Sequence, residues 1–172
     1  QFCTDHSLAT RLPDSFPKLA SKPLYAHQER AILSILAGRT TVVSTGTGSG
    51  KTEAFLVPIL DHCSKHRGRG VKAIIIYPMN ALANDQVRRL EKATADTEVT
   101  FGLFVGSTDA RTRDDIRRDP PDILITNYVM LDWMLTRLAD QAIFEASRVS
   151  LRYIFLDDWH TYRDIWATHL MY

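Results

Sequence analysis

The stretch Thr45-Gly46-Thr47-Gly48-Ser49-Gly50-Lys51-Thr52 decides the fold of this chain. It follows a short β-branched run, Thr41–Ser44, and it precedes an amphipathic stretch over 51–66. Closely spaced glycines let the backbone turn sharply and bring its N–H groups close to phosphate oxygens. The following helix adds the positive end of its dipole. The order of strand, glycine loop and helix therefore predicts a phosphate-binding loop.

In such a loop, Lys51 pairs with the β- and γ-phosphates of a nucleotide, and Thr52 ligates Mg²⁺. Thr45 stands where the generic pattern has glycine, although the Gly-Lys-Thr end is intact. The alternative is a glycine-rich turn before a helix, with Lys51 in solvent.

Further apolar runs recur along the chain, each nearly continuous and rich in β-branched or aromatic residues. Beyond Thr41–Ser44 they are Ala73–Tyr77, Phe101–Val105, Asp122–Thr126 and Arg152–Asp157. Continuous apolar runs are typical of strands that are covered on both faces, as in a parallel sheet. Helical spacing between the runs predicts helices over 25–37, 51–66, 80–93, 109–118 and 128–138. This alternation predicts an α/β fold with a mostly parallel sheet, helices on both faces and right-handed crossovers.

Composition narrows the class of protein. The chain has 172 residues, of which 45% are hydrophobic and 24% are charged, with a net charge of +1. A nucleic-acid contact must therefore come from a local patch. Two cysteines, Cys3 and Cys63, exclude a disulfide-rich scaffold or a four-cysteine zinc site. No apolar run approaches the roughly 18–20 residues of a membrane span, and we expect a cytoplasmic protein.

The charged stretch 109–119 alternates acids with arginines. Asp114 and Arg118 stand at i,i+4, which predicts an exposed helix with weak ion pairs.

A pair of carboxylates ends the last apolar run, in Phe155-Leu156-Asp157-Asp158-Trp159-His160. In phosphate-loop ATPases a strand-end aspartate holds Mg²⁺, and a second acidic group orients the attacking water. Asp157 fits the first role and Asp158 the second, while His160 would link the nucleotide site to other parts of the enzyme. A pair of surface aspartates that cap the next helix is the alternative.

These motifs together resemble the first RecA-like domain of superfamily 2 DEAD/DEAH-box (DExH) helicases, in particular bacterial Lhr-like and YprA-like DNA helicases. Thr45–Thr52 is similar to motif I, with its core at Thr47–Thr52, and Asp157–His160 is similar to motif II. Leu24–Gln28 resembles the adenine-recognition segment, in which Gln28 reads the adenine edge and Tyr25 is a stacking partner. The resemblance implies a nucleotide site with ATP and Mg²⁺ as cofactors. Its residues would be Tyr25, Gln28, Thr47, Gly48, Ser49, Gly50, Lys51 and Thr52, with Thr52 and Asp157 on the metal.

Two more segments resemble motifs that grip one nucleic-acid strand in the family. Tyr77–Gln86 looks like motif Ia, and Thr126–Leu131 looks like motif Ib. The resemblance implies contacts from Pro78, Asn80, Gln86, Thr126 and Asn127. Read without the resemblance, Asn80 and Asn127 are caps at strand-to-helix turns.

The resemblance runs from about Leu24 to Tyr162, so we expect an approach segment over 1–23 and a partial RecA-like domain over 24–172. The chain begins with Gln1 and stops at Tyr172, which predicts an excised or processed piece that is truncated at its C-terminal end. The family's motif III and its second RecA-like domain, the implied partner of this one, would lie downstream.

The expected function is ATP-driven movement on, or unwinding of, nucleic acid, with DNA favoured over RNA. Asp158 stands where the family usually has glutamate, and a carboxylate shorter by one methylene would slow hydrolysis. The chain alone is therefore expected to be weak or inactive. A catalytically silent fragment that binds nucleotide or a partner is the main alternative, and a small-substrate kinase is another.

Overall fold

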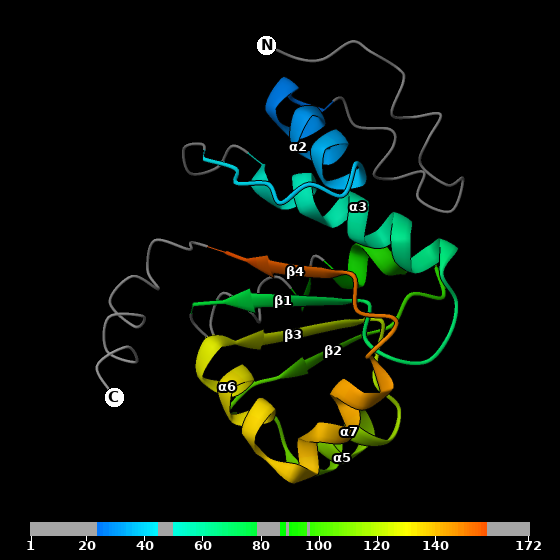
Figure 1. The fold of residues 1–172 in the computed structure, drawn as a ribbon, viewed down its shortest axis with the longest axis vertical. Coiled ribbons are helices and arrows are strands. Elements are labelled where there is room, and N and C mark those ends of the chain that lie inside the picture. The colour runs from blue at the N-terminus through cyan, green and yellow to red at the C-terminus, as the bar shows by residue number, and fades with distance from the viewer. Residues whose placement is uncertain (1–23, 45–49, 79–86, 89, 96, 158–172) are drawn as a thin grey trace. The chain divides into compact units, whose positions relative to one another are not determined.

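The computed structural model describes residues 24–44, 50–78, 87–88, 90–95 and 97–157 (Figure 1). The chain divides into two compact units, one of residues 1–67 and 93–99 and the other of residues 68–92 and 100–172. The predicted residues Thr47, Gly48, Ser49, Asn80, Gln86, Asp158 and His160 lie outside the described residues.

The first unit is built on two packed helices, α2 (Ala26–Leu36) and α3 (Lys51–Lys65). Ile32 of α2 and Val57 of α3 are buried against each other, and Leu24 and Leu33 cover them. These apolar positions recur at helical spacing, which is why both segments fold as amphipathic helices. The arrangement fixes the start of α3 close to the start of α2.

The second unit holds a parallel sheet of β1 (Ala73–Tyr77), β2 (Phe101–Phe104), β3 (Ile123–Asn127) and β4 (Tyr153–Leu156). The strand order is β2-β3-β1-β4. Each residue of β1 is buried, and so are the first four residues of β3. Burial on both faces explains the continuous apolar runs of these two central strands.

Three helices pack together beside this sheet in Figure 1, namely α5 (Ala110–Arg118), α6 (Tyr128–Thr136) and α7 (Leu138–Ala146). One face of the sheet supplies Ile74, Ile76, Leu124 and Phe104 to a shared core. Ile116, Met130, Met134 and Ile143 fill that core from the helices. The predicted α/β class with a mostly parallel sheet is confirmed.

The predicted strand at Thr41–Ser44 was wrong. These residues form neither helix nor strand, and the side chain of Val42 is 75% exposed. A strand exists only where its N–H and C=O groups join a ladder. The unit that contains this run has no strand among its described residues, so the β-branched run has no ladder to join there.

The helix predicted over 128–138 is α6, which ends two residues earlier than predicted. α6 ends at Thr136, Arg137 is extended, and α7 begins at Leu138. The break turns the chain so that Ile143 reaches the same core as Met130 and Met134.

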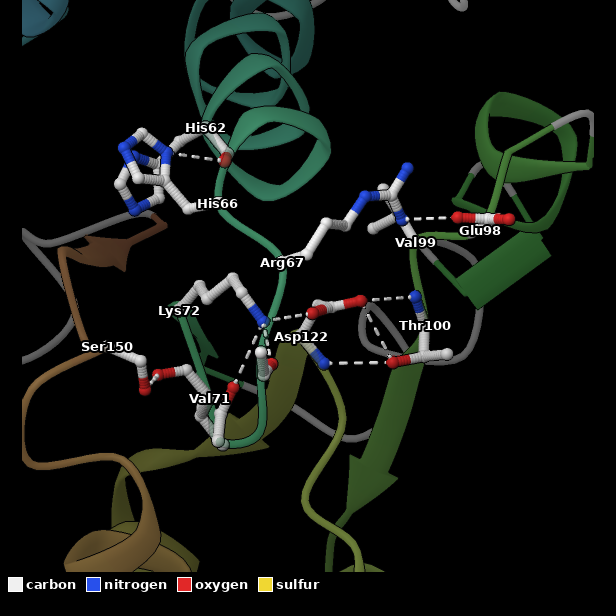
Figure 2. Close-up of polar contacts among 12 residues, drawn as sticks. His62, His66, Arg67, Val71, Lys72, Glu98, Val99, Thr100, Asp122 and Ser150 are labelled. Atoms are coloured by element: carbon white, nitrogen blue, oxygen red, sulfur yellow. Dashed lines mark hydrogen bonds and ion pairs between the residues drawn. The ribbon is translucent and has the colours of Figure 1, made fainter.

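Polar groups tie the amino ends of the strands together, as Figure 2 shows. Lys72, which directly precedes β1, is 2% exposed and forms an ion pair with Asp122, which precedes β3. Its ammonium also donates to the Gly68 carbonyl at 2.7 Å. The second carboxylate oxygen of Asp122 accepts from the backbone N–H of Thr100 at 2.8 Å, before β2. The buried ammonium of Lys72 and the half-buried carboxylate of Asp122 thus join the starts of three strands.

Candidate nucleotide and nucleic-acid site

The residue that precedes α3 has a backbone angle that favours glycine, as the predicted phosphate loop requires. Gly50 is the residue before the helix and has a φ of +76°, in the left-handed region. A Cβ at this position would lie 2.4 Å from the side-chain nitrogen of Gln28. The dihedral angle favours glycine here, and a larger residue would also displace the Gln28 side chain. Lys51 and Thr52 follow as the first two residues of α3, at the positive end of its dipole.

Gln28 connects the predicted adenine-recognition segment to this loop. Its side-chain nitrogen donates to the Gly50 carbonyl at 2.7 Å, and its side-chain oxygen accepts from the Tyr25 N–H at 2.8 Å. The residue is 4% exposed. Two segments that lie 22 residues apart are thereby held in a fixed relation.

Tyr25 directly precedes α2 and is 40% exposed. Its ring stacks on the ring of His27, with centroids 5.6 Å apart and planes 13° from parallel. An exposed aromatic face beside the glycine loop is compatible with stacking on a nucleobase. The adenine roles of Tyr25 and Gln28 stay predictions.

The carboxyl edge of the sheet carries the other predicted residues that the structure describes. Asp157 comes directly after β4, and its N–H donates to the Ile76 carbonyl of β1 at 3.0 Å. Pro78 comes directly after β1, so the two residues follow paired strands at one edge. In open α/β sheets ligands bind outside this edge. Lys51 and Thr52 belong to one compact unit and Asp157 to the other, and their joint role at one magnesium ion stays a prediction.

Thr126 and Asn127, predicted to contact nucleic acid, end β3 at the same edge. Thr126 is fully buried, and its hydroxyl donates to the Phe104 carbonyl of β2 at 2.7 Å. Asn127 begins α6 as its N-cap, and its side-chain oxygen accepts from the Met130 N–H at 2.8 Å. The cap interpretation of Asn127 is confirmed. Because its side chain is buried, Thr126 would affect a bound nucleic-acid strand only by positioning the residues next to it.

The arginines of α5 pair differently from the predicted pattern. Arg117 binds Asp114 at 2.7 Å and Asp140 of α7 at 2.8 Å, and Arg118 pairs with Asp115 at 3.4 Å. Within α5, Arg117 and Arg118 thus pair with aspartates three residues earlier, and Arg118 pairs with Asp115 and not with Asp114. The fully buried carboxylate of Asp140 explains why Arg117 turns toward α7, because a buried charge needs a partner.

Neither a membrane span nor a metal cluster is found in the described part of the chain. No described helix is long and apolar enough to cross a bilayer. No group of three or more His, Cys, Asp or Glu side chains gathers there. A magnesium site does not need such a group, since Mg²⁺ is usually held by one or two carboxylates, waters and substrate phosphates.

A family model for DEAD/DEAH box helicases matches residues 25–170. The chain belongs to this family. The resemblance of its motifs to the family is therefore confirmed.

Named helicases are among the relatives of this DEAD/DEAH box chain. The ATP-dependent helicase YprA of Bacillus subtilis is 28% identical over 166 residues, which are 95% of this chain and 22% of YprA. Druantia protein DruE of Escherichia coli is 37% identical over 135 residues, which are 66% of this chain and 7% of DruE. The chain thus spans less than a quarter of the length of either relative.

Solved helicase structures share the fold. The structure of the helicase MrfA bound to DNA and AMPPNP matches 93% of this chain and 23% of MrfA, with 27% identity and a TM-score of 0.79. The structure of Mycobacterium smegmatis Lhr bound to ssDNA and AMP-PNP matches 88% of this chain and 21% of Lhr, with 27% identity and a TM-score of 0.76. The sheet and helices of this DEAD/DEAH box chain are RecA-like, as predicted.

A loop that sequence reasoning passed over follows β2 at the carboxyl edge of the sheet, over residues 105–109. The sequence offered one signal for this loop, namely a glycine shortly after an apolar strand, followed by an aspartate that can cap the next helix. Asp109 is that cap, and its side chain accepts from the Thr112 N–H at 2.9 Å.

Proposed function

We propose that this chain is the ATP-binding part of a helicase or translocase motor that acts on nucleic acid, with DNA favoured over RNA. The observation that carries the proposal is the start of α3. A left-handed glycine precedes Lys51 and Thr52, and Gln28 is hydrogen-bonded to the carbonyl of that glycine. Glycine-rich loops that lead into the start of a helix bind phosphates through their N–H groups.

The residues at this helix start fit a magnesium nucleotide. Gly50 has a left-handed backbone angle that glycine adopts without strain. Lys51 would neutralise the β- and γ-phosphates, together with the loop residues Thr47, Gly48 and Ser49. Thr52 and Asp157 would hold Mg²⁺, which supplies charge neutralisation when it is bound. Gln28 and Tyr25 would select adenine.

The chemical step would use the carboxylates after β4. In this proposal Asp158 orients the attacking water and His160 connects the nucleotide site to the rest of the motor. Asp157 directly follows a strand that pairs with β1, which gives it a rigid position at the carboxyl edge.

The nucleic-acid strand would be gripped at the ends of β1 and β3, by Pro78, Asn80, Gln86 and Asn127, with Thr126 as support. Such contacts with the phosphate backbone are largely independent of sequence and sensitive to salt. DNA is favoured because MrfA and Lhr, both 27% identical to this chain, were solved with DNA. A second RecA-like domain would complete the ATP cleft, and the motor would act in the cytoplasm.

A second function, a silent nucleotide-binding module, is favoured by one observation. Asp158 stands where the family usually has glutamate, and in-line attack depends on the position of the water.

The ATPase rate, measured with and without single-stranded DNA, separates the two functions. The motor with its second RecA-like domain is compared with its Asp158→Glu variant at saturating Mg-ATP. The motor proposal predicts turnover that rises with DNA, and a faster rate in the variant. If ATP binds but neither protein turns over with or without DNA, the silent module is the correct function.

A further inference from the structure

We propose that Arg113 is a positioning residue, which turns two peptide N–H groups of the loop 105–108 outward toward the phosphodiester backbone of a bound strand. This inference rests on the proposed nucleic-acid function and adds a residue to it. Arg113 lies on α5, one turn after the Asp109 cap, and is half-buried.

The guanidinium of Arg113 holds two successive carbonyls of the loop. Its Nη2 atom donates to the Val105 carbonyl at 3.0 Å and to the Gly106 carbonyl at 2.9 Å. Thr108 fixes the same turn from the other side. Its hydroxyl accepts from the Val105 N–H at 2.9 Å and donates to the Leu103 carbonyl at 3.0 Å. The peptide planes of the loop are therefore set by side chains at both ends.

The orientation of the carbonyls fixes the orientation of the N–H groups. In a planar trans peptide the C=O of one residue and the N–H of the next point in opposite directions. Because the Val105 and Gly106 carbonyls face Arg113, the N–H groups of Gly106 and Ser107 face away from it. Both residues are exposed, and a Cβ built on Gly106 meets no atom within 4 Å. Two successive outward N–H groups form a concave binding feature for an anion.

Arg113 itself is directed inward. Its guanidinium carbon lies 5.4 Å from the centre of the Phe104 ring. Its Nε atom is buried and has no hydrogen-bond partner within the described part of the chain. The guanidinium of Arg113 thus interacts with the Phe104 ring and the two loop carbonyls. These contacts favour a role in positioning the loop over direct contact with a phosphate.

The loop lies next to the proposed strand grip. Phe104 of β2 pairs with Thr126 of β3, and the Thr126 hydroxyl bonds to the Phe104 carbonyl. The loop after β2 therefore begins beside Asn127, which follows Thr126. A phosphate backbone that passes over the end of β3 would reach the Gly106 and Ser107 N–H groups next.

The test compares three variants of the chain with the wild type: Arg113→Gln, Arg113→Lys and Arg118→Gln. The last removes the same charge from the exposed far end of α5. A fluorescent oligothymidine is titrated at several salt concentrations, with magnesium and a non-hydrolysable ATP analogue, and binding is followed by anisotropy. Amide hydrogen exchange of α5 and β2 checks that each variant is folded.

We expect Arg113→Gln to bind roughly tenfold more weakly, because two hydrogen bonds that orient the loop are lost. The slope of log affinity against log salt stays unchanged, since Arg113 touches no phosphate. Arg113→Lys restores part of the affinity, because an ammonium can still donate to one carbonyl. Arg118→Gln changes the affinity less than about twofold.

Three results would overturn the inference. Equal affinity of Arg113→Gln and Arg118→Gln means that the loop contributes nothing, although the proposed function stands if the wild type binds. A slope reduced by about 0.7 in Arg113→Gln alone means that Arg113 contacts a phosphate directly. Absence of binding by the wild type contradicts the proposed function, and the inference falls with it.

Discussion

The two edges of the sheet use polar residues in different ways. At the amino edge, Lys72 and Asp122 are directed into the protein, and their charges join the starts of β1, β2 and β3. At the carboxyl edge, the half-buried residues Pro78, Asn127 and Asp157 stand on the turns that follow the strands. The amino edge therefore holds the strands in register, and the carboxyl edge is the one from which a ligand can be bound.

The largest effect is expected at the amino edge. Asp122→Ala leaves the ammonium of Lys72 buried without its counter-charge. Removal of one partner of a buried ion pair costs about 3–5 kcal/mol. Urea unfolding followed by circular dichroism should show a loss of this size. The double variant Lys72→Met with Asp122→Leu should be much closer to the wild type, because no charge is left unpaired. A double variant as unstable as Asp122→Ala would contradict this role for the pair.

A smaller effect is expected where Thr126 links β3 to β2. Thr126→Val keeps the shape of the side chain but leaves the buried Phe104 carbonyl without its hydroxyl donor. A buried acceptor that loses its donor costs roughly 1–3 kcal/mol. Thr136→Val is the matched control, because the Thr136 hydroxyl bonds to carbonyls of its own helix at an exposed position. Equal urea midpoints for the two variants would show that the link between β2 and β3 is not stabilising.

Variants of Asn127 separate its structural role as the cap of α6 from its proposed contact with nucleic acid. Asn127→Ala removes the cap of α6 and should cost about 1 kcal/mol of unfolding free energy. Asn127→Asp keeps an oxygen acceptor for the Met130 N–H and should keep the stability. Its carboxylate should nevertheless weaken oligonucleotide binding by repelling phosphates. If Asn127→Asp binds the oligonucleotide as the wild type does, this end of β3 is a structural turn only.

The smallest effect concerns pH and the exposed cap at Asp109. Hydrogen bonds from the backbone N–H and the hydroxyl of Thr112 hold the pKa of the Asp109 carboxyl below its usual value of 3.8. A lowered pKa in the folded state means that the carboxylate stabilises the fold above pH 3.8, and that this contribution is lost as the pH falls through the lower folded value. Asp109→Asn keeps a cap oxygen but does not titrate.

The difference in urea midpoint between the wild type and Asp109→Asn should therefore be constant near neutral pH and should shift against the wild type below pH 3.8. A difference that does not change with pH would mean that Thr112 does not favour the charged form.

Much of the fold could be predicted because its signals are local. Ala73–Tyr77 and Ile123–Thr126 are buried, and continuous apolar runs are typical of strands that are covered on both faces. The run Thr41–Ser44 carries the same signal but forms no strand, because strand formation also needs a partner that a local pattern cannot supply. Helix α7 was not predicted. Its nine residues bury only Asp140 and Ile143, and its start depends on the backbone of Arg137.

The features of the site also divide into those with a local sequence signal and those that depend on packing. Gly50, Lys51 and Thr52 could be predicted as the start of a helix, because glycine followed by a good helix start is a short-range pattern. The bond between Gln28 and the Gly50 carbonyl spans 22 residues, and the pairing of Arg117 with Asp140 spans 23. Such contacts follow from packing, so that periodicity and spacing gave no sign of them. The role of Arg113 could not be predicted for the same reason, because the sequence shows it only as one of several arginines in a charged helix.

In the proposed function, Lys51 and Asp157 serve one magnesium nucleotide. The most direct test is titration calorimetry of an ATP analogue with the wild type, Lys51→Ala and Asp157→Asn, each with and without Mg²⁺. The account predicts that Mg²⁺ strengthens binding to the wild type, that Lys51→Ala removes binding in both conditions, and that Asp157→Asn keeps the magnesium-free affinity while losing the gain from Mg²⁺. An Asp157→Asn variant with the full gain from Mg²⁺, or a Lys51→Ala variant with wild-type affinity, would contradict it.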